Sequence, residues 1–114
     1  MKTKALGNYL RMYRKKSGLS LRELGSLLGY KDLSPVSKHE RSLSVPPLAI
    51  ALCYEVIFRV PVSDLFPGVH ARVTREIESK LAALEAELGQ RSGKGRGANV
   101  TAKKLIWLTE RRER

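Results

Sequence analysis

The spacing of apolar residues constrains this chain most. Apolar side chains recur every three or four positions in successive segments, and no stretch alternates apolar and polar residues over the length of a strand. Helix-start signals divide these segments: a capping-box pattern at Ser20 and Glu23, and prolines in the dipeptides 34–35 and 46–47. The sequence therefore predicts an all-α protein whose first part consists of short helices.

Five short helices are expected in residues 1–68. Their approximate ranges are 6–16, 20–28, 34–41, 48–58 and 62–66. In the second, residues 21, 24, 27 and 28 form the apolar side, and Gly29 is expected to end it. In the third, Ser34 is the expected N-cap and Pro35 the first helical residue. Because only five residues connect these two helices, we expect them to cross steeply, as in a helix-turn-helix.

Beyond Gly68 the pattern changes to one long amphipathic helix over 69–90, followed by a basic flexible linker and a short C-terminal helix in 91–114. An apolar stripe that follows a complete small domain needs a partner, either its own domain or a second copy. We expect dimerisation through this stripe. Its residues are Val73, Ile77, Leu81, Leu84 and Leu88.

The charge indicates the partner. The chain has 22 Lys and Arg against 11 Asp and Glu in 114 residues, a net charge of +11. Such an excess favours a polyanion, nucleic acid above an anionic membrane surface. Since no segment is apolar enough to span a bilayer and none looks like a targeting signal, we expect a cytoplasmic, nucleoid-associated protein without a membrane partner.

The sequence offers no pattern for catalysis or metal binding. The single cysteine, Cys53, lies in an apolar run, which predicts a buried, inert thiol and excludes an internal disulfide. His39 and His70 lack companions at metal-ligand spacing, and His39 is expected to be a half-buried packing residue. We therefore expect no catalytic residue, no metal and no cofactor.

The third expected helix has two different faces. Ser34, Ser37, Lys38 and Arg41 share one face at helical spacing, while Val36, His39, Glu40 and Leu43 share the other. Short hydroxyl groups beside Lys and Arg suit readout of bases in the major groove, although a solvated polar face has the same composition.

The stretch from Leu10 to Gly68 resembles the Cro and phage-repressor type of helix-turn-helix, the XRE family. The segments LRMYRKKSGLS, RELGSLLG, VSKHER and VSDLF occur in the order of that family. This sequence departs from the usual pattern in three ways: Leu21 replaces a glutamine, Ser42 replaces a glycine, and the turn is one residue longer.

The resemblance implies that the helix over 34–41 reads bases and that Arg14 pairs with Glu40. The expected base-reading residues are Ser34, Pro35, Ser37, Lys38 and Arg41. Phosphate contacts are expected from a helix N-terminus and from flanking loops. Their residues are Arg22, Lys31, Ser42 and Ser44.

The function expected from these features is sequence-specific binding of double-stranded DNA by a transcriptional regulator, most simply a repressor that binds a palindromic operator as a homodimer. One alternative is an antitoxin-type protein, whose C-terminal half binds a partner protein while the N-terminal half represses its operon. A second is a non-specific nucleoid protein. A self-cleaving repressor is set aside, because we expect too little chain after Gly68 to form a protease domain.

Overall fold

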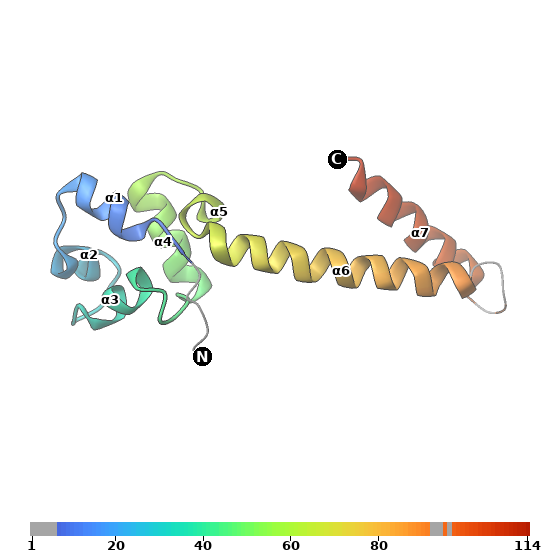
Figure 1. The fold of residues 1–114 in the computed structure, drawn as a ribbon, viewed down its shortest axis with the longest axis horizontal. Coiled ribbons are helices and arrows are strands. Elements are labelled where there is room, and N and C mark those ends of the chain that lie inside the picture. The colour runs from blue at the N-terminus through green and yellow to red at the C-terminus, as the bar shows by residue number, and fades with distance from the viewer. Residues whose placement is uncertain (1–6, 92–94, 96) are drawn as a thin grey trace. The chain divides into compact units, whose positions relative to one another are not determined.

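The computed structural model describes residues 7–91, 95 and 97–114, and these contain seven α-helices and no β-strand. The predicted all-helical class is therefore confirmed. The chain forms two compact units, Met1–Ala71 and Arg72–Arg114, divided within the sixth helix. The helices are α1 (Leu10–Ser17), α2 (Leu21–Leu27), α3 (Ser34–Glu40), α4 (Leu48–Phe58), α5 (Val62–Leu65), α6 (Pro67–Arg91) and α7 (Ala98–Arg112), as labelled in Figure 1.

Both ends of α2 are set by local sequence. Glu23 N–H donates to Ser20 Oγ over 3.0 Å, and Ser20 N–H donates to Glu23 Oε1 over 2.9 Å, which is the predicted capping box. The bond from the Ser20 backbone N–H to the carboxylate lowers the pKa of Glu23. At the other end Gly29 has a φ of 88°, and the N–H groups of Gly29 and Tyr30 donate to the carbonyls of Ser26 and Gly25. This is a Schellman ending, which turns the chain toward α3.

Replacing Ser20 with alanine should lower the free energy of unfolding of residues 1–71 by about 1 kcal/mol, because the N-cap bond is lost. All four tyrosines precede residue 72, while the single tryptophan follows it. Tyrosine fluorescence in a Trp107→Phe background therefore reports on this unit during urea unfolding. Ser26→Ala is the control, since Ser26 is exposed inside the same helix. Equal losses in both variants would contradict the assigned cap.

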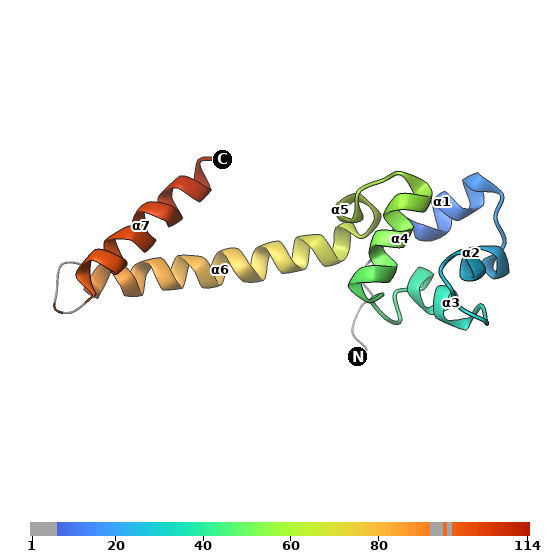
Figure 2. The same ribbon diagram turned by 180° about the vertical axis from the view of Figure 1, so that it is seen from behind.

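One apolar core joins the helices of residues 1–71. Its buried members are Leu10, Leu24, Leu28, Val36, Tyr54, Leu65 and Phe66. The Tyr54 ring stacks against Phe58 with a centroid distance of 6.4 Å and meets Phe66 at 6.3 Å. Because each of the first five helices contributes a buried side chain, the position of α3 depends on the whole core. Figures 1 and 2 show α2 and α3 side by side.

Several local predictions were wrong. Ser34 is already helical and is not the N-cap; instead Asp32 Oδ1 accepts the Ser34 N–H over 2.7 Å. Leu27 and Leu43 are 60% and 61% exposed, although helical spacing placed both on inward faces. Leu27 is the last residue of α2. Leu43 lies beyond the end of α3, so helical periodicity does not apply to Leu43. The long helix, expected to begin at residue 69, begins at Pro67, whose fixed φ suits the first position of a helix.

Residues 72–114 contain most of α6 and all of α7, which folds back from the end of α6 and diverges from it (Figure 2). Leu88 and Leu108 are buried, and the Arg111 guanidinium donates to both oxygens of Glu78 over 3.3 and 2.9 Å. Arg91, which we expected at the start of the linker, is the last residue of α6. Within the described ranges, none of the helices combines the length and apolar character needed to cross a membrane.

Candidate nucleic-acid interface

The side chains of α3 divide into a buried side and an accessible side. Val36 is fully buried and His39 is 4% exposed. We call Ser34, Ser37, Lys38 and Arg41 the reading face; Ser34 and Ser37 are partly exposed, and Lys38 and Arg41 are exposed. Pro35 is partly exposed. The helix ends at Glu40, one residue earlier than predicted, but the Arg41 N–H still donates to the Ser37 carbonyl over 3.1 Å. Arg41 is therefore the C-cap of α3 and stays on the accessible side of the helix.

His39 seats α3 on α4. Its Nδ1 lies 2.9 Å from the Tyr54 hydroxyl, and the two rings meet edge to face with centroids 5.8 Å apart. Burial lowers the pKa of His39 and raises that of the Tyr54 hydroxyl, so both side chains are neutral near neutral pH. This confirms the packing role predicted for His39. Among the described residues, no three His, Cys, Asp or Glu side chains gather as potential metal ligands.

The burial of His39 predicts a pH-dependent stability. Its pKa in the folded protein is below the ordinary value of 6.5, so the unfolded chain binds the proton more tightly. The stabilisation is complete above that value and is lost as the pH falls from it through the lower pKa of the folded protein. Urea unfolding should therefore give a smaller free energy of unfolding at about pH 5.5 than at about pH 7.5. His39→Gln should reduce the loss, whereas His70→Gln, at an exposed position, should retain it. If His39→Gln loses as much stability on acidification as the wild type does, the pH dependence does not come from His39.

The structure brings Arg14 and Glu40 together in a bidentate ion pair. Arg14 Nε lies 2.6 Å from Glu40 Oε2, and Nη2 lies 3.1 Å from Oε1. The two side chains are 11% and 5% exposed, and the bond to Glu40 raises the pKa of Arg14. Arg14 Nη1 also donates to the Leu19 carbonyl over 3.1 Å. One guanidinium thus connects α1, the loop before α2 and the last residue of α3.

Asn8 holds the C-terminal end of α3, and sequence reasoning missed it. Its Nδ2 donates to the His39 carbonyl over 2.9 Å and to Ser42 Oγ over 3.1 Å, while its Oδ1 accepts the Leu10 N–H. Asparagine is a favoured residue at the start of a helix. The sequence placed the start of the first helix at Leu6, which lies outside the described residues, so Asn8 was not considered as a residue that precedes the helix. The helix begins at Leu10.

The four expected phosphate-contacting residues are accessible to different degrees. Arg22 lies in the first turn of α2 and Lys31 in the turn before α3, and both are exposed. Ser44, in the loop after α3, is also exposed. Ser42 is partly exposed, has a φ of 60°, and its Oγ accepts the bond from Asn8, so part of its hydrogen-bonding capacity serves the fold.

The positive charge of residues 1–71 lies on the surface. This segment has eleven Lys and Arg against five Asp and Glu, a net charge of +6. Four of the five acidic side chains make hydrogen bonds within the fold: Glu23, Asp32, Glu40 and Glu55. Of the basic residues that the structure describes here, Arg14 is largely buried and eight are exposed. These are Arg11, Lys15, Lys16, Arg22, Lys31, Lys38, Arg41 and Arg59.

The stripe that we expected to form the dimer is only partly accessible. Val73, Ile77 and Leu84 are 41–46% exposed, Leu81 is partly exposed, and Leu88 is 1% exposed. Leu81 and Leu108 line one small hollow between α6 and α7. The expectation that all five residues face a partner is therefore wrong for Leu88, because α7 is longer than predicted and packs on this part of α6.

Comparisons with protein families, curated proteins and solved structures found no match to this chain.

Proposed function

We propose that this protein is a sequence-specific double-stranded DNA-binding transcriptional regulator that acts as a homodimer, with α2 and α3 forming a helix-turn-helix. The observation that carries the proposal is the fixation of α3 from behind. Buried Val36, the His39–Tyr54 hydrogen bond and the Arg14–Glu40 ion pair hold one side of the helix. The opposite side presents a positively charged reading face. The sequence resemblance to the XRE family supports the same function.

In the proposed complex, α3 lies in the major groove and its two long cationic side chains read base edges. Lys38 and Arg41 can donate to guanine O6 and N7, and the hydroxyls of Ser34 and Ser37 can pair with either base type. Arg22, Lys31, Ser42 and Ser44 contact phosphates and fix the register without reading the sequence. Binding across a promoter would exclude polymerase, which makes repression the simplest outcome.

Selection of bound duplexes from a random pool tests the proposal. We expect an inverted repeat whose half-site centres are about 10 base pairs, or a multiple of that, apart. A double variant, Lys38→Ala with Arg41→Ala, should enrich a weaker or different motif, while the matched control Lys15→Ala with Lys16→Ala should enrich the wild-type motif. Recovery of no motif with the wild-type protein would reject sequence-specific binding.

A second candidate function rests on α7. Ile106 and Trp107 are 59% and 51% exposed on this helix, and exposed aromatic and aliphatic side chains are typical anchors of protein interfaces. An antitoxin-type protein would use residues 72–114 to bind a partner protein and residues 1–71 to repress its operon. A partner that co-purifies with the wild type and is lost in Trp107→Ala, with DNA binding retained, would favour this function.

A further inference from the structure

The outer side of α4 is apolar and uncovered. Leu48, Leu52 and Val56 lie on successive turns and are 74%, 46% and 76% exposed. Leu27, at the end of α2, lies beside them and is 60% exposed. We call these four residues the α4 face. A hollow of about 340 Å³ lies within it. Its lining residues are Leu27, Ala49, Leu52, Cys53, Val56 and Ile57, all uncharged.

The area of the α4 face is in the range of interaction sites. Its four large side chains are 46–76% exposed. Together they amount to several hundred Å², a patch size that is often functional. The inner side of α4 already packs through Ala51 and Tyr54. A helix that is apolar around its whole circumference is normally covered on all sides. The α4 face therefore lacks a covering surface among the described residues 7–71.

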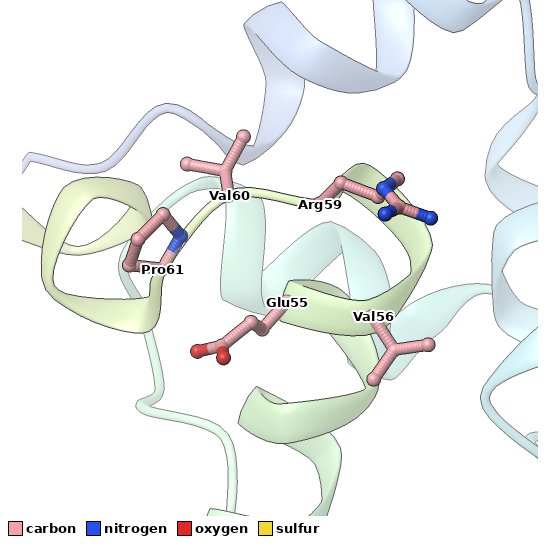
Figure 3. A pocket seen from close by; sticks show the side chains of 5 residues that line it. All are labelled: Glu55, Val56, Arg59, Val60 and Pro61. Carbon is pink, nitrogen blue, oxygen red and sulfur yellow. The ribbon is translucent and has the colours of Figure 1, made fainter.

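Past Val56, toward the end of α4, the surface becomes mixed. Val56 also lines a second hollow of about 440 Å³, together with Glu55, Arg59, Val60 and Pro61. Figure 3 shows that the charged ends of Glu55 and Arg59 point away from each other. Glu55 Oε1 accepts the Val62 N–H over 2.9 Å, so this carboxylate caps α5. The charged groups near Val56 thus lie at the border of the α4 face.

We infer that the α4 face pairs with the same face of a second copy of this chain; this deepens the proposed function and rests on it. Two chains that each carry +11 repel one another, so they can approach closely only through an uncharged surface. The residues lining the central hollow are such a surface. An acidic partner would instead gain most from the exposed basic side chains. The uncharged lining therefore makes this face the part of the surface where a second copy meets little local repulsion.

The connection between α4 and α3 gives a second reason. Binding to two half-sites about 34 Å apart requires a fixed distance between the two recognition helices. The surface that joins the copies must then be rigidly linked to α3. Tyr54 of α4 bonds His39 of α3 within one buried core, whereas the α6 stripe continues into a separate unit. Pairing through α4 would set the spacing of the reading faces directly.

The test is the self-association of full-length variants by analytical ultracentrifugation. Leu48→Glu and Val56→Glu change the two most exposed members of the face, so folding should be retained, and circular dichroism checks it. Each should raise the dissociation constant of the dimer about tenfold or more. Because the chain is strongly positive, an added carboxylate reduces general repulsion and cannot by itself explain weaker pairing. Ile77→Glu tests the competing interface, the α6 stripe expected from the sequence, and pairing through the α4 face predicts no weakening in this variant.

A monomeric wild type, unchanged pairing in either α4 variant, or an equal effect of Ile77→Glu would overturn the inference. The proposed function is tested separately, with a duplex that carries one half-site. Val56→Glu should bind this duplex as the wild type does but lose the gain in affinity on the full inverted repeat. Failure of the wild type to bind any selected half-site would reject the proposed function, whereas intact half-site binding with unchanged pairing would reject only the α4 interface.

Discussion

Replacing Arg14 with alanine should lower the free energy of unfolding of residues 1–71 by about 3–5 kcal/mol, because it leaves Glu40 largely buried without its counter-charge. The loss is large for a domain whose total stability is about 5–15 kcal/mol. It should also weaken binding to the selected operator, since the end of α3 loses its connection to α1 and to the Leu19 carbonyl. Urea unfolding followed by tyrosine fluorescence, and titration with the operator duplex, measure the two effects.

Two further variants separate charge from geometry. Arg14→Lys keeps the charge but cannot form the bidentate contact, so most of the loss should remain. Combining Arg14→Met with Glu40→Leu removes both charges and should restore most of the stability, because no buried charge is left unpaired. Lys15→Ala, at the neighbouring exposed position, should have little effect. Unchanged stability in Arg14→Ala would show that the pair does not support α3.

Replacing Lys38 with alanine should weaken binding to the selected operator by about 1–3 kcal/mol, roughly fivefold to more than a hundredfold. Binding to a scrambled duplex should change little, because the proposed contact of Lys38 is to base edges. Lys31→Ala is the matched control: it removes one exposed lysine from the turn before α3, and we expect it to weaken both duplexes alike. Competition titrations at one fixed salt concentration give the dissociation constant of each variant on each duplex, relative to that of the wild type. Uniform loss in both variants would contradict the assigned reading face.

Features encoded by neighbouring residues were predictable from the sequence. The bounds of α4 were predicted as 48–58 and match the structure, because prolines flank one continuous apolar segment. The capping box of α2 was equally local. The Arg14–Glu40 contact spans 26 positions and was anticipated only through the family resemblance.

Features that depend on packing between distant segments were not predictable. Asn8 contacts residues 31 and 34 positions away, and nothing in its own neighbourhood indicates that geometry. The burial of Leu88 required knowing that α7 folds back from the end of α6. The exposure of Leu27 depends on where α3 and α4 leave the end of α2 uncovered. Periodicity identifies an apolar side of a helix, but it does not say whether that side faces the core or an open surface.

Sequence readout by α3 is measured by comparing the wild-type affinity for the selected operator with that for a scrambled duplex of the same length. The measurement is a fluorescence titration of each duplex at several salt concentrations. We expect a ratio of dissociation constants of roughly a thousand or more near physiological salt. Both affinities should fall as salt rises, because phosphate contacts contribute to both. Equal affinity for the two duplexes at every salt concentration would contradict sequence readout by α3.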